Sequence, residues 1–111
     1  MNEIEKTPGT KVQYQISGNY ISFRDGDMTL NLANRERDEE NIIDICEDLN
    51  GEIVIGVADG YKYLAQIAIP ARSYTDTEGE LDEETGETPI IPVAEPFDIS
   101  KCTIYLWGGV Q

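Results

Sequence analysis

Alternation of apolar and polar residues with a period of two, interrupted by Gly-containing turns, constrains the fold of this chain more than any other feature. The alternation covers residues 11–16 and 28–33, and a third short segment with strand-forming residues lies at 20–24. Successive side chains of a β-strand point to opposite faces, so this pattern predicts half-buried strands. The dipeptide Asp25-Gly26 is a strong hairpin signal. We therefore expect the three segments to form an antiparallel meander.

The segment 42–49 has two interpretations. Ile42, Ile45 and Leu49 have the spacing of one helical face. Three β-branched Ile residues favour a strand instead, and Asn50-Gly51 leads directly into a second Ile-rich segment. We favour a strand followed by a hairpin turn.

Residues 61–69 form the longest predicted strand, which Pro70 ends. The odd-numbered residues of this strand are predicted to share one face: Tyr61, Tyr63, Ala65, Ile67 and Ile69.

The last predicted strand covers residues 103–107. In it Tyr105 and Trp107 alternate with the apolar residues Cys102, Ile104 and Leu106. We expect both faces of this strand to be buried between two sheets. The alternative is an exposed aromatic platform that would stack against sugars.

Seven or eight short strands joined by tight turns predict a single all-β domain over residues 1–111. The expected architecture is a small antiparallel β-sandwich or a partly open barrel. A chain of 111 residues can bury an adequate core without metals or disulfides. Cys46 and Cys102 each lie in an apolar segment, and we expect two buried free thiols.

A long acidic hairpin loop, residues 74–89, interrupts the strand pattern. It contains seven carboxylates, and no Lys or Arg lies anywhere between Arg72 and Lys101. A Pro-rich arm follows at residues 89–96, and its three prolines restrict it to extended chain or an edge strand. The acidic loop is predicted to project from the folded domain, and the Pro-rich arm is expected to lie along a partner.

The charge balance narrows the classes of partner. With 8 basic and 22 acidic residues, the chain has a net charge of −14. Direct nucleic-acid binding and docking on anionic lipid both need basic surfaces, so we expect neither. A basic protein surface or divalent cations are the natural complements. The N-terminal residues lack the features of a signal peptide, so we expect cytoplasmic synthesis.

The residue types needed for common catalytic sites are missing from the sequence. There is no histidine, no Gly-rich phosphate loop and no paired-Cys motif. We therefore expect no enzymatic activity and no cofactor. A twelve-residue calcium loop starting at Asp76 would need Gly at its sixth position, where Leu81 stands, so no metal site is predicted.

Five acidic residues of the loop occupy every second position. In an extended chain they would share one face at intervals of ~6.6 Å, a spacing that resembles a row of backbone phosphates. The alternative is a solvated hairpin tip whose charge prevents aggregation. The candidate partner-binding residues are Asp76, Glu78, Glu80, Asp82 and Glu84.

These features together suggest a non-catalytic structural or interaction protein. We expect it to contact a protein partner, either sister subunits in a homo-oligomer or a basic protein surface. Small all-β proteins with long loops are typical of bacteriophage particles, so a minor virion component (a decoration, head-closure or tail-connector protein) is the favoured hypothesis. The first alternative is an acidic inhibitor that mimics nucleic acid and blocks a DNA-handling enzyme. A lesser alternative is a carbohydrate-binding module.

Overall fold

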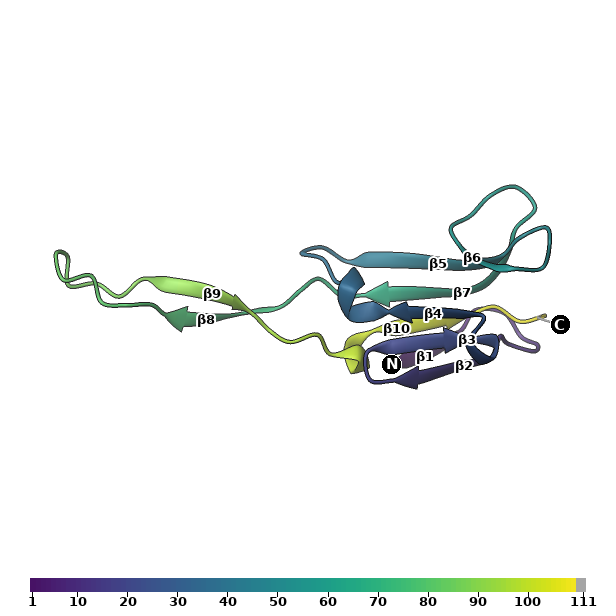
Figure 1. Cartoon of the computed structure of the whole chain (residues 1–111), viewed down its shortest axis with the longest axis horizontal. Coiled ribbons are helices and arrows are strands. Elements are labelled where there is room, and N and C mark those ends of the chain that lie inside the picture. The colour runs from purple at the N-terminus through teal and green to yellow at the C-terminus, as the bar shows by residue number, and fades with distance from the viewer. Residues whose placement is uncertain (110–111) are drawn as a thin grey trace.

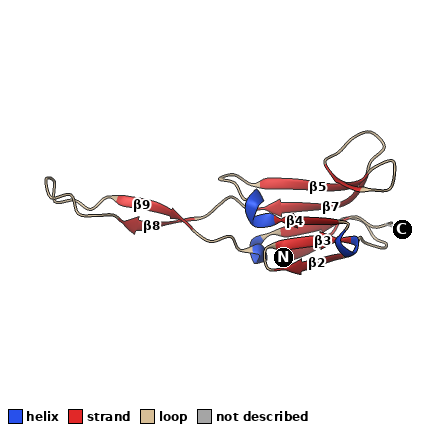
Figure 2. Ribbon diagram, viewed as in Figure 1, coloured by secondary structure: helices blue, strands red, loops and turns tan. Residues whose placement is uncertain are grey.

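The computed structural model describes residues 1–109, and the chain in it is built from β-strands and short 3₁₀ helices (Figure 2). The strands are β1 (Asn2–Glu5), β2 (Tyr14–Ser17), β3 (Tyr20–Phe23), β4 (Met28–Asn31), β5 (Asn41–Glu47), β6 (Ile53–Ile55), β7 (Lys62–Ile69), β8 (Tyr74–Glu78), β9 (Ile90–Ala94) and β10 (Thr103–Leu106). The 3₁₀ helices are η1 (Arg24–Gly26), η2 (Leu32–Arg35) and η3 (Ile99–Lys101). The predicted all-β fold is confirmed, and none of the described sheets closes into a barrel.

The strands form sheets of five, three and two strands. The five-stranded sheet has the order β1-β10-β7-β5-β6, in which β1 runs parallel to β10 and the other pairs are antiparallel. The three-stranded sheet is the predicted meander β2-β3-β4. The ambiguous segment 42–49 is a strand over most of its length, and β5 pairs with β6 across the predicted hairpin.

A bulge in β7 changes which of its side chains face the core. Ile45 of β5 pairs with Ala65, but the next residue, Cys46, pairs with Tyr63, so Leu64 is extra on the β7 side. Leu64 is fully buried, and Tyr63 lies on the face opposite to Ala65. The prediction that Tyr63 shares a face with Ala65 is therefore wrong, because a bulge breaks the period of two.

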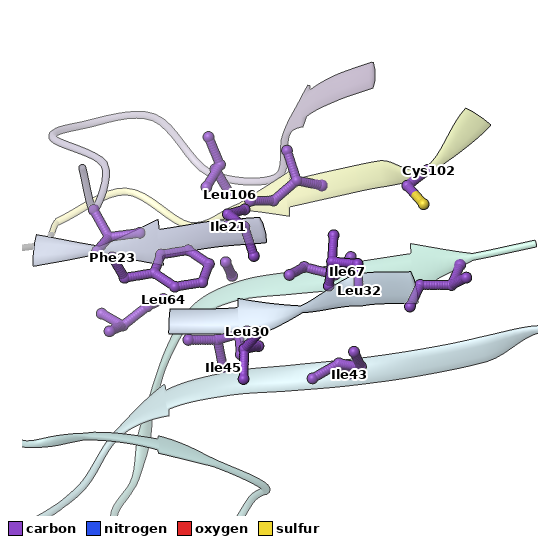
Figure 3. Packing of buried hydrophobic residues seen from close by; sticks show 14 residues of the cluster. Ile21, Phe23, Leu30, Leu32, Ile43, Ile45, Leu64, Ile67, Cys102 and Leu106 are labelled. Atoms are coloured by element: carbon purple, nitrogen blue, oxygen red, sulfur yellow. The ribbon is translucent and has the colours of Figure 1, made fainter. Parts of the chain in front are cut away.

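The hydrophobic core lies between the five-stranded and three-stranded sheets. Figure 3 shows side chains of β3 and β4 meeting those of β5, β7 and β10. The residues in it that are fully buried are Ile21, Phe23, Leu32, Ile45, Leu64, Ala65, Ile67, Ile69, Cys102 and Ile104. Both thiols are free and buried, as the sequence predicts.

The aromatic residues of the last strand lie outside this core. Ile104 and Leu106 point into the core, so the alternating Tyr105 and Trp107 lie on the outer face of the five-stranded sheet. Both are only partly buried. The expectation that both faces of this strand are buried between two sheets is wrong.

The third sheet is a two-stranded ribbon that extends away from the sandwich (Figure 1). With it the chain measures 67 × 26 × 23 Å along its principal axes. We call this ribbon and its tip, residues 74–94, the arm, and the rest of the described chain the body. Among the described residues, no helix has the length and apolar character needed to cross a membrane.

Candidate functional site

The arm joins the predicted acidic loop and the Pro-rich segment into one structure. β8 pairs antiparallel with β9, from Tyr74 opposite Ala94 to Glu78 opposite Ile90. The ladder continues beyond both strand ends, since Gly79 N donates to the carbonyl oxygen of Pro89 at 2.8 Å. Every residue of both strands is exposed. The ribbon is therefore held by its own ladder and not by burial against the body.

The tip of the arm is a compact turn. Asp82 N donates to the carbonyl oxygen of Glu87 at 2.9 Å, and Gly86 N donates to that of Asp82 at 2.7 Å. The Asp82 carboxylate also accepts from Glu84 N at 2.9 Å. Gly86 has φ = +72°, a left-handed conformation that glycine adopts without strain. Local hydrogen bonds therefore define the tip despite its charge.

The structure separates the five candidate acidic residues into two groups. Asp76 and Glu78 lie on one face of β8, at alternate strand positions. Glu80 lies beyond the end of β8, and Asp82 and Glu84 belong to the tip turn. The described arm thus lacks a continuous extended row of five carboxylates. The role of these residues in binding stays a prediction.

The arm also exposes apolar residues that the sequence argument did not single out. Ile90, Ile91 and Val93 of β9 have exposed fractions of 61%, 46% and 48%. Ile90 lies on one face of the ribbon, and Ile91 and Val93 lie on the other. These side chains are open to contact with another molecule. The sequence Ile-Ile-Pro-Val at residues 90–93 is the signal from which these apolar residues could have been identified.

The root of the arm is fixed to the body by Arg72. Its backbone N donates to the carbonyl oxygen of Arg37 at 2.7 Å, and its Nη2 donates to that of Glu36 at 3.0 Å. The guanidinium also contacts the carboxylates of Glu36 at 3.4 Å and Asp38 at 3.2 Å. The Tyr74 hydroxyl donates to Asp38 as well. Hydrogen bonding to Tyr74, together with Glu36, raises the pKa of Arg72, which therefore stays charged.

An open cleft of about 410 Å³ lies on the body between β1 and β2. Some of the polar side chains that line it have partners within the chain. The Tyr14 hydroxyl donates to Glu3 at 2.7 Å, and Lys11 Nζ lies 3.3 Å from Glu5. Burial and the bond to Glu3 raise the pKa of Tyr14 to about 12, so it stays a neutral phenol.

Three aromatic side chains on the outer sheet face have partners within the chain. Tyr63 and Trp107 stack on each other, with ring centroids 4.9 Å apart and an interplanar angle of 24°. Lys6 Nζ lies over the ring of Tyr105, 4.9 Å from its centroid. One face of each ring is therefore already occupied. The carbohydrate-binding alternative stays a prediction.

Over residues 1–109, no group of three or more Cys, Asp or Glu side chains has an arrangement that would hold a metal ion. Comparison of the chain with protein-family models, with curated proteins and with solved structures gave no match.

Proposed function

We propose that the protein is a non-catalytic interaction protein that binds a basic protein partner through the arm. The observation that carries this proposal is the set of exposed apolar side chains on a charged ribbon outside the core. The core of the body contains no residue of the arm, so the arm can bind a partner without loss of core contacts.

The apolar residues of β9 provide affinity. Complete burial of an Ile or Val side chain is worth roughly 1.5–3 kcal/mol, so burying the exposed half of one is worth about 1 kcal/mol. Ile91 and Val93 share one face of the ribbon, so a partner that covers this face gains about 2 kcal/mol from them, or roughly thirtyfold in Kd.

The acidic residues provide selectivity. The arm contains no Lys or Arg, and the whole chain has a net charge of −14. Contact between the arms of two copies would place like charges together, which opposes homotypic binding. A basic partner is favoured, and its association should be fast at low salt.

A multi-subunit assembly is the setting that suits a small body with a projecting arm. A bacteriophage particle is one such assembly, and the sequence already favoured the hypothesis that this protein is a minor component of one. The nucleic-acid mimic has less support, because only Asp76 and Glu78 keep the strand spacing on which that hypothesis depends. Competition by duplex DNA for the partner would favour mimicry.

The test uses an arm-shortened variant in which residues 76–92 are replaced by Asn-Gly. A tagged wild-type chain expressed in its native cells should co-purify stoichiometrically with a defined partner or particle, and the arm-shortened variant should not. Val57→Ser is the matched control, because Val57 is 54% exposed on the body. Retention of the partner by the arm-shortened variant would contradict the proposal.

A further inference from the structure

The two long edges of the arm are not equivalent. Gly79 and Pro89 form a hydrogen-bonded pair, with Gly79 N donating to the carbonyl oxygen of Pro89. Hydrogen-bonded and non-hydrogen-bonded pairs alternate along an antiparallel ribbon. Asp76 and Pro92, three pairs further along, therefore form a non-hydrogen-bonded pair. Their backbone groups point outward from the ribbon.

The outer edge of β9 is closed to a further strand. Pro92 has no N–H, and it stands at a position whose backbone groups point away from β8. The missing N–H therefore leaves the β8–β9 ladder intact but interrupts any new ladder on the outer edge of β9. The outer edge of β8 is different. Tyr74, Asp76 and Glu78 retain outward N–H and C=O groups, and each of these residues is exposed.

A two-stranded ribbon is marginally stable in water, and a third strand would stabilise it. A second copy of the chain is a poor source for that strand. In the antiparallel register that overlaps the whole of β8, Asp76 of one copy would face Asp76 of the other, and like charges directly opposite destabilise a sheet. A strand with Lys or Arg at the facing positions would have the complementary charge.

We propose that the outer edge of β8 accepts one extended strand from a basic partner protein, so that the arm becomes a three-stranded sheet. This inference depends on the proposed function, since it specifies how the arm binds. Backbone hydrogen bonds of Tyr74, Asp76 and Glu78 would provide the pairing, and the two carboxylates would select basic side chains. Pro92 restricts the addition to this edge.

Synthetic nine-residue peptides in which lysine alternates with threonine provide the probe. A lysine that faces Asp76 in the new ladder directs its own N–H toward β8. One peptide is N-methylated at its lysines and a second at its threonines, so the two have the same charge. The threonine-methylated peptide should bind about tenfold or more tightly than the lysine-methylated one, because only the former keeps the pairing N–H groups. Fluorescence anisotropy at fixed salt gives both Kd values.

Two variants of the full chain make the test reciprocal. Asp76→Asn and Asp76→Pro remove the same charge, but only the proline removes the outward N–H. Asp76→Asn should keep the preference between the two peptides, and Asp76→Pro should abolish it. Equal affinity for both peptides in the wild type, with binding lost in the arm-shortened variant, would refute strand addition and leave the proposed function standing. Binding that survives in the arm-shortened variant would contradict both.

Discussion

Removal of the arm should leave the body folded with nearly unchanged stability. The arm-shortened variant retains Thr75 and Val93, which by the alternation of the ladder form a hydrogen-bonded pair. A two-residue Asn-Gly turn closes such a pair without strain. The construction therefore tests the division into arm and body without introducing a new defect.

The expected change in the free energy of unfolding follows from burial. None of the buried apolar residues lies in the arm, so the variant loses no core contact. The connection from β7 to η3 becomes roughly half as long, which favours the variant by about 0.6 kcal/mol through loop-closure entropy. Loss of the exposed hydrogen bonds between β8 and β9 lowers the free energy of unfolding of the variant. We expect a net change within about 1 kcal/mol, whereas Ile67→Ala in the core should lose about 2–5 kcal/mol.

Urea unfolding followed by Trp107 fluorescence and far-ultraviolet circular dichroism measures both variants against the wild type. A single cooperative transition with nearly wild-type stability supports the division. A loss of 3 kcal/mol or more on shortening the arm, or a transition that is no longer cooperative, would refute it.

Three further predictions concern the body. Gly108→Ala should destabilise it by about 1–3 kcal/mol, because the added Cβ would lie 1.8 Å from the carbonyl oxygen of Pro8; a loss below about 0.5 kcal/mol in urea unfolding would contradict this. Burial raises the pKa of Cys102 to about 11, so the native protein at pH 8 should resist labelling of this thiol by a disulfide reagent until it is unfolded, and rapid native labelling would be the contrary result. Burial and the hydrogen bond to Glu3 raise the pKa of Tyr14 to about 12 from 10.0, so its neutral form contributes stability that is complete below about pH 10 and is lost as the pH rises toward 12. Tyr14→Phe should remove this part of the alkaline loss, and identical pH profiles for the two proteins would disprove the assignment.

Local patterns explain why much of the body could be predicted from the sequence. The meander β2-β3-β4 follows from a period of two, the β5–β6 hairpin follows from β-branched residues, and each has a nearby turn dipeptide. Two features depend on distant pairing and have no local signal. One is β1, a short charged segment that becomes a strand only by pairing in parallel with β10. The other is the extra residue Leu64, whose bulge reverses the orientation of Tyr63.

The candidate site could be predicted only in part, for a similar reason. Charge identified the acidic segment, and proline identified the extended one, but the sequence did not indicate that they pair. Pro92 argued against a strand with a regular ladder. The structure resolves this conflict, because Pro92 falls at a non-hydrogen-bonded position where no N–H is needed. Ile90 thereby shares a face of the ribbon with Asp76, whereas Ile91 and Val93 lie on the opposite face.

Site-specific photo-cross-linking in native cells tests most directly whether the arm is the binding surface. A photoreactive amino acid is placed at Ile91 on the arm or at Val57 on the body, two residues with exposed fractions of 46% and 54%. The account predicts one discrete adduct with a basic protein from position 91 and none from position 57. No adduct at position 91, or the same adduct from both positions, would contradict it.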